Sequence, residues 1–182
     1  MSQDYSMHYV CTLEEARKLV AAHDHFWVSN CGCRKAKGGC PHSRMDICMI
    51  FRGDIGASGS GQREINLTEV LAIFDEVVEK KLVPRPYRND TNKDITDGIC
   101  FCCPGCCAYF ANPAENKCDK GKFMETTDME ICNFCGDCVP SCHFGARKLV
   151  DDEIVISRDD CYGCGLCVDK CPEDAIQMRS RV

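Results

Sequence analysis

The sequence lacks any long hydrophobic run and any recognisable export signal at its start. Its longest apolar segments fall far short of the roughly 20 residues that a membrane-spanning helix needs, so we expect no insertion into a membrane. The opening stretch, MSQDYSMHYV, contains no basic cluster, apolar core or small-residue cleavage site, which are the marks of a secretory leader. From these absences we expect a cytoplasmic protein.

Positive charge is also scarce. The 182 residues include 22 Lys and Arg against 28 Asp and Glu, a formal net charge of −6 before any anionic cofactor is counted. Binding of nucleic acid needs a basic surface that neutralises phosphates, so this balance argues against DNA or RNA as a partner. An acidic protein docks favourably on basic patches, and we expect redox partner proteins. Formation of an oligomer is compatible with the sequence.

Cysteine, by contrast, is abundant. The chain contains 19 cysteines, an odd number, and most of them stand in tight clusters rather than at the spacings of disulfide staples. Such a density is typical of small secreted proteins, but the clustering and the expected reducing compartment favour thiolates bound to metal.

An internal repeat carries the strongest pattern. CNFCGDCVPSCHFGA at residues 132–146 recurs as CYGCGLCVDKCPEDA at residues 161–175, each with the spacing C-x2-C-x2-C-x3-C. In this spacing three thiolates of a tight loop reach one cubane cluster, and the fourth ligates the other cluster. One predicted 4Fe–4S site is therefore Cys132, Cys135, Cys138 and Cys171, and the other is Cys161, Cys164, Cys167 and Cys142.

Over about residues 128–178 the chain resembles the bacterial-type two-cluster ferredoxins. The resemblance implies a small ferredoxin-like domain with two 4Fe–4S clusters and a role in electron transport. His143 departs from the family pattern, which has proline after the fourth cysteine. One explanation is that the loop simply tolerates histidine in place of proline. The sharper alternative is that the ring donates a hydrogen bond that tunes the reduction potential of the adjacent cluster. The segment RKLVDDEIVIS between the copies predicts two short strands around an Asp-Asp turn.

Two amphipathic helices are predicted before the repeat. Thr12 and Glu15 fit a capping box at the start of the first helix, over residues 11–23. Asn66 fits the cap of a second helix with an apolar stripe, which Pro84 is expected to stop ahead of a polar loop. We therefore expect an α+β protein, with a helical, loop-rich, cysteine-rich metal-binding domain at residues 1–125 and the two-cluster domain at residues 126–182.

Nine further cysteines form two groups on either side of the second predicted helix, and we expect them to converge on one metal site. The candidate ligands are Cys31, Cys33, Cys40, Cys48, Cys100, Cys102, Cys103, Cys106 and Cys107. The last five stand within the stretch ICFCCPGCCAYF. Cys11 and Cys118 stand alone and are interpreted as bystanders. The short basic run at Arg34, Lys35 and Lys37 is interpreted as a solvated loop face.

This half is also similar to a family of modular iron–sulfur proteins from anaerobic bacteria and archaea. Its members join a C-x-C-R…C…C-(L/M)-x-F segment and an amphipathic helix to an I-C-N-C-C-x-C-C stretch and a ferredoxin module. The matching residues are Cys31, Cys33, Arg34, Cys40, Cys48, Met49, Phe51, Ile99, Cys100, Cys102, Cys103, Cys106 and Cys107. Phe101 replaces the asparagine, and Pro104 and Gly105 are inserted. The resemblance implies iron–sulfur redox chemistry.

Three interpretations of the nine cysteines stay open. They can hold at least one further iron–sulfur cluster, a structural zinc ion on four thiolates, or a redox-active dithiol beside a cluster. The first predicts an electron-transfer protein that passes electrons between the ferredoxin-type clusters and an additional N-terminal metal–thiolate centre. The alternative is a ferredoxin-dependent reductase of a disulfide or small molecule, with chemistry at Cys100–Cys107. A third function, which follows if the thiolates bind zinc, is that of an interaction subunit. No catalytic residue is assigned.

Overall fold

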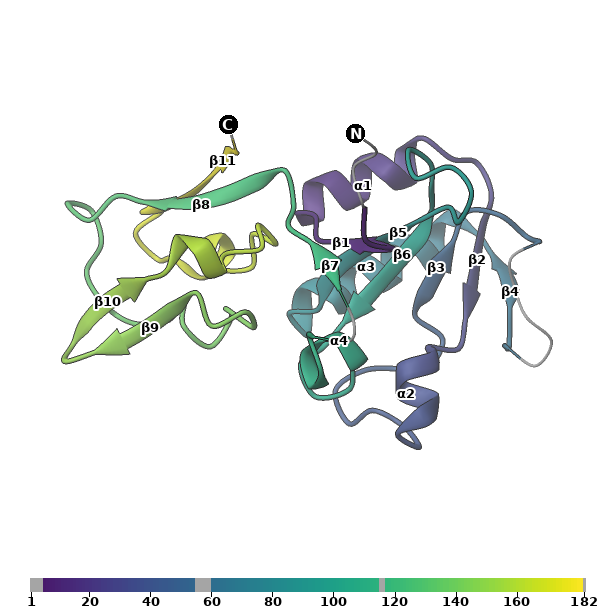
Figure 1. Ribbon diagram of the computed structural model, residues 1–182, viewed down its shortest axis with the longest axis horizontal. Coiled ribbons are helices and arrows are strands. Elements are labelled where there is room, and N and C mark those ends of the chain that lie inside the picture. The colour runs from purple at the N-terminus through teal and green to yellow at the C-terminus, as the bar shows by residue number, and fades with distance from the viewer. Residues whose placement is uncertain (1–4, 55–59, 115–116, 182) are drawn as a thin grey trace.

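A seven-stranded sheet organises the first part of the chain. The computed structural model describes residues 5–54, 60–114 and 117–181, and in this part the strand order across the sheet is β4-β2-β3-β6-β5-β1-β7 (Figure 1). The strands are β1 His8–Tyr9, β2 Phe26–Ser29, β3 Cys48–Ile50, β4 Arg63–Ile65, β5 Val83–Arg88, β6 Thr96–Cys102 and β7 Cys118–Asp119. Neighbours pair antiparallel except β1 and β7, which are parallel.

The α+β class is confirmed, but the prediction of a helical, loop-rich N-terminal part is wrong. Several strands of the sheet have only two to four residues, too few for an alternating pattern to show in the sequence. They gain their stability from their neighbours in the sheet instead of from local preference. The cysteine-rich segments consequently lie within or directly beside the sheet.

The second correction concerns Pro84, which does not lead into a loop. It lies in β5 with Pro86, paired with Phe101 and Ile99 of β6. Alternate residues of a strand direct their backbone groups to the same side, and the carbonyl of Pro84 accepts from Cys11 on the β1 side. The missing N–H groups of both prolines therefore fall on that side, and the ladder with β6 stays intact.

Both predicted helices are present. Helix α1 is Leu13–Ala21, and helix α3 is Leu67–Glu79. Each begins with the reciprocal pair of hydrogen bonds of a capping box, Thr12 with Glu15 and Asn66 with Glu69. The remaining helices, α2 (Gly32–Ala36) and α4 (Ala108–Ala111), are short and each follows a candidate ligand cysteine.

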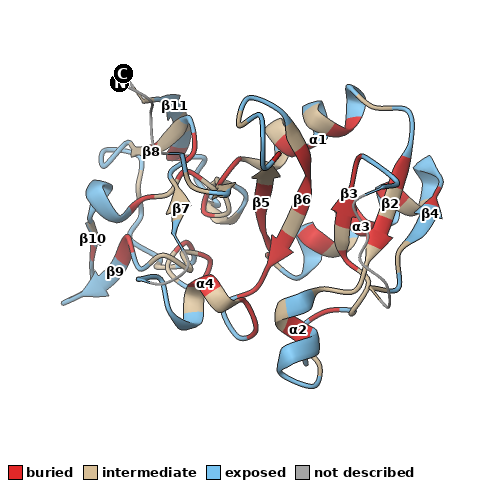
Figure 2. Cartoon of the chain, turned by 45° about the vertical axis from the view of Figure 1, so that its right-hand side comes forward, coloured by how far each residue is buried: buried red, intermediate tan, exposed pale blue. Residues whose placement is uncertain are grey.

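The main core lies between the sheet and the helices α1 and α3. The apolar stripe of α3 contributes buried side chains that pack with residues of α1, β2, β3 and β6. They are Val70, Ile73, Phe74 and Val77. Buried residues are concentrated on β3, β5 and β6 in Figure 2. In the described part of the chain, the helices are all too short or too polar to cross a membrane.

The C-terminal residues form a lobe beside the sheet (Figure 1). Strand β8 (Phe123–Thr127) pairs antiparallel with β11 (Ile176–Ser180), and β9 (Arg147–Val150) pairs with β10 (Glu153–Ile156). The single-turn helices η1 (Arg158–Asp160) and η2 (Val168–Lys170) complete the lobe. The predicted boundary between the two domains, at residue 126, falls inside β8. The division of the chain into these two domains stays a prediction.

The hairpin predicted between the two cysteine repeats is confirmed. Asp151 and Asp152 join β9 to β10 with φ angles of +49° and +63°. Two consecutive left-handed residues form the tight turn whose twist suits a two-residue hairpin, and aspartate tolerates that conformation.

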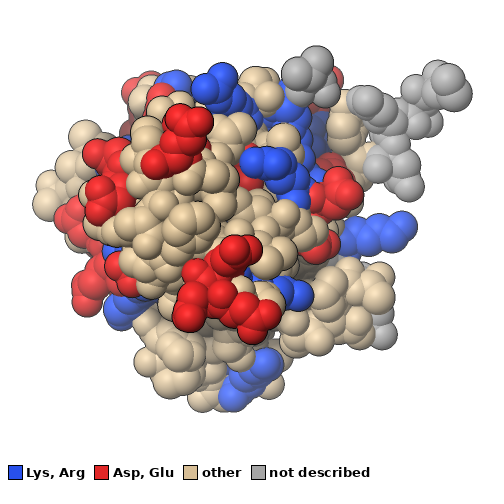
Figure 3. Space-filling view, turned by 90° about the vertical axis from the view of Figure 1, so that its left-hand side faces the viewer, with Lys and Arg blue, Asp and Glu red and all other residues tan. Residues whose placement is uncertain are grey.

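The surface of the C-terminal lobe is acidic. Residues 123–181 include twelve Asp and Glu but six Lys and Arg. Figure 3 views the molecule from this side, where acidic side chains gather in several places around uncharged surface. Exposed apolar side chains of this lobe include Ile131, Phe134, Leu149, Val150 and Val155. The lobe therefore combines negative charge with apolar surface.

Candidate metal centres

Four cysteines of the C-terminal lobe line one internal cavity. They are Cys142, Cys161, Cys164 and Cys167. These are the ligands that the spacing predicts for one cluster, with one thiol supplied by the other copy of the repeat. Gly163 lines the same cavity at φ +80°, and a Cβ there would lie 2.1 Å from the carbonyl oxygen of Phe123. The close backbone approach and the four thiols fit a thiolate-bound cubane.

Three members of the other predicted set share one apolar cluster with a cysteine of the first. They are Cys132, Cys138 and Cys171, packed with Cys167. Cys135, the fourth member, is exposed. The N–H of Ala175 donates to the Sγ of Cys171 at 3.2 Å, and Nη1 of Arg147 donates to the Sγ of Cys138 at 3.4 Å. Such donors stabilise negative charge on sulfur, so this set also fits a cluster. The assignment of the eight ligands stays a prediction.

Two buried thiols of this lobe are weak acids when no metal is bound. Burial raises the pKa of Cys164 and of Cys167 to about 12. At neutral pH these thiols are therefore protonated unless the positive charge of a metal draws off the proton, so ligation and deprotonation occur together.

His143 contacts the other part of the chain. Its Nε2 lies 2.9 Å from the carbonyl oxygen of Lys81, just beyond helix α3. The ring edge also packs on Phe110. This imidazole therefore joins the C-terminal lobe to the end of a core helix, and that contact gives it a role apart from the predicted tuning of a cluster.

The nine candidate ligands of the N-terminal part lie together, but in two groups. We call the first the thiol triad: Cys40, Cys103 and Cys106. We call the second the six-thiol row: Cys100, Cys48, Cys31, Cys33, Cys107 and Cys102. Each group combines cysteines from both sides of α3, so the two sequence groups lie together, but as two clusters of thiols where the sequence predicts one metal site.

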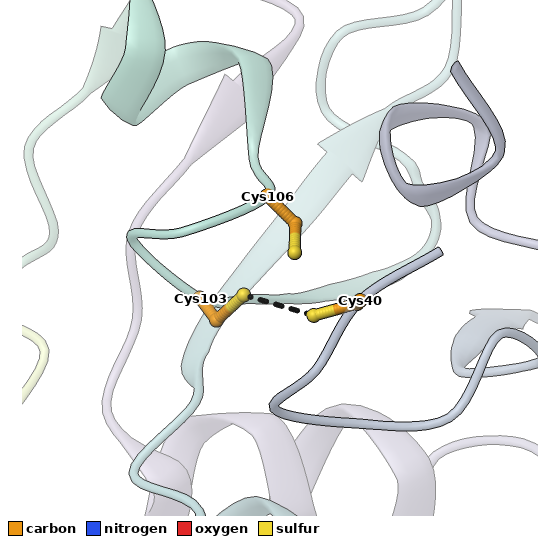
Figure 4. A group of neighbouring side chains, drawn as sticks. All are labelled: Cys40, Cys103 and Cys106. Carbon is orange, nitrogen blue, oxygen red and sulfur yellow. Dashed lines mark hydrogen bonds between the residues drawn. The ribbon is translucent and has the colours of Figure 1, made fainter. Parts of the chain in front are cut away.

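The thiol triad surrounds a point. Its three sulfur atoms all lie within 4.8 Å of one another, and the Sγ atoms of Cys40 and Cys103 are 3.5 Å apart. Figure 4 shows the three side chains directed toward one another from the loop after α2 and from the turn after β6. Cys103 and Cys106 are buried, and Cys40 is half-buried.

The six-thiol row follows the ends of β3 and β6. The Sγ atoms of Cys48 and Cys100 are 4.0 Å apart. Cys31 hydrogen-bonds Cys48 and Cys33, and Cys33 continues the row to Cys107. The row then ends at Cys102, which hydrogen-bonds Cys107. These thiols are linked pairwise, one to the next, whereas those of the triad close around a centre.

A cavity of about 450 Å³ opens between the two groups. Its lining includes seven of the nine candidate cysteines, together with Arg85 and His8. A space of this size among so many thiols suits a polynuclear metal cluster or a small bound molecule.

Two residues of this site escaped the sequence analysis. Arg85 is buried in β5, where Nη1 donates to the Sγ of Cys107 at 3.0 Å and Nε donates to the Sγ of Cys118 at 3.3 Å. Its guanidinium also lies 4.6 Å from the centroid of Tyr109. Cys118, interpreted as a bystander, thus borders the site. His8 lies beside the row, with Nε2 3.8 Å from the Sγ of Cys100. No spacing signal marks residues that join the site through sheet pairing.

The interpretation of Arg34 as a solvated residue is wrong. Its side chain is 1% exposed and donates hydrogen bonds to the hydroxyl of Ser43 at 3.1 Å, the carbonyl of Phe101 at 3.2 Å and the carbonyl of Arg44. These bonds connect α2, the loop with Cys40 and the end of β6. Arg34 therefore positions the cysteine-bearing segments relative to one another.

The environment changes the acidity of the N-terminal thiols. Hydrogen bonds from Cys107 and Cys31 hold the pKa of Cys33 far below its usual range. Burial opposes ionisation of Cys40, but hydrogen bonds from Cys106 and from the backbone N–H of His42 lower its pKa to about 7. Anionic sulfur is the form that binds metal or attacks a disulfide, so this region is prepared for either chemistry.

The comparisons with known proteins concern the cysteine repeat. A family model described as a 4Fe-4S dicluster domain matches residues 131–176. The chain is 36% identical to an uncharacterized ferredoxin of Methanocaldococcus jannaschii and 37% identical to a ferredoxin of Methanothermococcus thermolithotrophicus. These matches cover 29% and 30% of this chain, and 90% and 95% of the two relatives. No solved structure matches.

A third relative is a subunit of an enzyme. The chain is 38% identical to the pyruvate synthase subunit PorD of Methanothermobacter marburgensis, over 31% of this chain and 65% of that subunit.

The lobe with its paired four-cysteine runs is thus an iron–sulfur module of the two-cluster type. Since it covers nearly the whole length of two ferredoxins at more than a third identity, the chain belongs to the ferredoxin family.

Proposed function

We propose that this protein passes electrons between the two clusters of its C-terminal lobe and a further iron–sulfur centre bound by the N-terminal thiols. The ferredoxin module accounts for the first half of this function. When bound, its clusters accept and donate single electrons. The second half depends on the six-thiol row and its position next to the module.

The observation that carries the proposal is a shared apolar cluster between the two sites. Cys102 and Cys107 of the six-thiol row pack in the same cluster of side chains as Cys164 of the C-terminal lobe. Tyr109 and Tyr162 belong to it too, with ring centroids 5.9 Å apart. Continuous packing of apolar side chains brings the two sets of thiols close, which favours electron transfer between them.

The charges around the row support a redox centre. A cluster bound by several thiolates carries net negative charge, and the buried guanidinium of Arg85 offsets part of it. His8 at Cys100 adds a second nitrogen group that is able to donate to sulfur. Both residues stabilise a reduced, more negative centre relative to its oxidised form.

The acidic lobe supplies a docking surface for an external redox partner. Cys135 is exposed, and exposed apolar side chains at Ile131 and Phe134 lie close to it in the sequence. A partner with a basic patch around an apolar contact would complement this face. Electrons would then enter through the cluster nearest the surface and continue inward.

Metal analysis of protein purified without oxygen tests the proposal. Two cubanes account for about eight irons per chain, so we expect more than eight irons with a matching amount of sulfide. Replacing Cys48 or Cys100 with serine should remove the excess iron and leave the eight of the ferredoxin module. An iron content of eight that neither substitution lowers would contradict the proposed centre.

A second candidate is the reduction of a disulfide or another small molecule in the cavity beside Arg85. The low pKa of Cys33 next to Cys107 favours it, because a thiolate paired with a second thiol is the arrangement of a dithiol reductant. One turnover would need two electrons, one from each ferredoxin cluster, and two protons to convert a disulfide to two thiols. Counting accessible thiols before and after dithionite reduction separates the candidates, because only this one predicts two additional thiols.

A further inference from the structure

We infer that the thiol triad is a separate zinc site of the type Cys3His, with Cys40, Cys103 and Cys106 as thiolate ligands and His42 as the fourth ligand. This inference goes beyond the proposed electron transfer. It divides the nine N-terminal cysteines between two metals of different chemistry and adds a ligand that cysteine spacing alone does not indicate.

The distances among the triad sulfurs suit a single ion. With zinc–sulfur bonds of about 2.3 Å and a tetrahedral angle, two ligand sulfurs lie about 3.8 Å apart. The 3.5 Å between Cys40 and Cys103, and the limit of 4.8 Å for all three pairs, agree with this spacing. In a cubane each thiolate binds a different iron, so the sulfurs are spread around a larger body. Within the described residues, no three of the eight ferredoxin-type cysteines come together as the triad does.

The local backbone has the features of a zinc knuckle. Cys103 and Cys106 are separated by two residues, a spacing common in structural zinc sites, and the N–H of Cys106 donates to the carbonyl of Cys103 to close the turn. On the opposite side, the backbone N–H groups of His42 and Ser43 donate to the Sγ of Cys40. Amide donors to a ligand sulfur stabilise its thiolate form and orient it toward the metal.

His42 is placed to supply the fourth ligand, but its ring nitrogens do not lie within 4.8 Å of all three sulfurs as the ring stands, so the side chain turns toward the ion when zinc binds. It follows Cys40 by two residues, and its imidazole lies over the turn that carries the other two ligands. A Cβ on Gly105 would lie 3.1 Å from Nε2 of His42, which shows how closely the ring approaches this turn. Residue 105 can have no larger side chain without moving the ring. Once the ring has turned, three thiolates and one imidazole would form a closed tetrahedral site, the arrangement of structural zinc.

Further contacts hold the same two segments together. Nζ of Lys37 donates to the carbonyl of Gly105 at 3.0 Å, and Arg34 connects Ser43 to the end of β6. The turn that carries Cys103 and Cys106 is flanked by Cys102 and Cys107 of the six-thiol row. A zinc ion at the triad would therefore fix the turn on which two ligands of the proposed redox centre depend.

The experiment measures zinc and iron in the full chain, purified without oxygen from cells supplied with both metals. We expect one zinc per chain in addition to the iron. Cys40→Ser and His42→Ala should each lower the zinc content, to near zero for the first, and leave the iron of the ferredoxin module in place. Cys48→Ser is the matched control, because it lies in the six-thiol row and should lower iron while one zinc stays bound.

Cobalt provides a second measurement. Protein produced with Co²⁺ in place of zinc should show thiolate-to-cobalt charge transfer and the intense visible bands of a tetrahedral site, and His42→Ala should shift these bands. His42 is exposed, so this variant is expected to fold even if Cys40→Ser does not.

Several outcomes would overturn the zinc site. They are a chain without zinc, a Cys40→Ser variant that loses iron instead of zinc, a zinc content that rises only as iron falls between preparations, and cobalt bands that His42→Ala leaves unchanged. The proposed redox centre is judged separately, by the iron content of Cys48→Ser.

Discussion

The buried ion pair of the C-terminal lobe gives the sharpest prediction about stability. The side chains of Arg147 and Glu125 are 1% and 2% exposed and form a salt bridge. Arg147 also donates to the Sγ of Cys138. Replacing Arg147 with methionine would leave a buried carboxylate whose Oε1 already lacks a hydrogen-bond partner and faces Nε of Arg158 at 3.5 Å.

The expected cost follows from this burial. Removing one partner of a buried pair costs about 3–5 kcal/mol, whereas exposed pairs contribute less than about 1 kcal/mol. With a urea dependence of about 1.5 kcal/mol per molar, the unfolding midpoint should fall by about 2–3 M. The double variant Arg147→Met with Glu125→Gln removes the orphaned charge and should recover about half of the loss.

The assay follows urea unfolding without oxygen by the visible absorbance of the clusters and by far-ultraviolet circular dichroism. The pair Arg88–Asp119, which is partly exposed, provides the control, and Arg88→Met should shift the midpoint much less. Equal effects of Arg147→Met alone and of the double variant would refute the reasoning, because the loss would then come from packing and not from an unpaired buried charge.

Three further predictions concern the metal sites. Arg85→Gln removes a positive charge beside the six-thiol row and should lower the reduction potential of the N-terminal centre by on the order of 50–100 mV in redox titrations, while Arg88→Gln leaves it unchanged. Gly163→Ala should abolish one ferredoxin cluster, seen as a loss of about four irons, since the added methyl group meets a backbone carbonyl at 2.1 Å. In metal-free protein the alkylation rate of Cys40 should rise with pH and reach half its maximum near pH 7, because its pKa is lowered to about 7; a midpoint at pH 9 would contradict this.

The structure also gives a physical role to the junction between the two parts. Phe144 and Tyr162 stack with ring centroids 4.4 Å apart, and Tyr109 packs against both. Their rings belong to the same apolar cluster as two thiols of the N-terminal row and Cys164. Aromatic packing of this kind keeps water out and holds the two sites at a constant separation.

The sequence by itself determined the features that depend on local spacing. The two C-x2-C-x2-C-x3-C runs, the Asp-Asp hairpin, the capping box of α1 and the Asn66 cap of α3 each depend on residues a few positions apart. Local backbone geometry then decides where the side chains point, so a pattern in the sequence is sufficient to predict them. The sequence also predicts that the two N-terminal cysteine groups approach each other, since two apolar, thiol-rich segments gain by burial together, but it predicts a single site.

Only the tertiary structure decided how those nine thiols are divided. Cys40 joins Cys103 and Cys106 across more than sixty residues of chain, while Cys48, only eight residues after Cys40, joins Cys100 instead. Pairing of β3 with β6 sets this division, because the register places Met49 opposite Ile99 and so brings the adjacent cysteines together. Arg85 enters the site in the same way, through the register of β5 with β6. Strand pairing acts between distant segments, and short strands with prolines carry no local pattern that would reveal it.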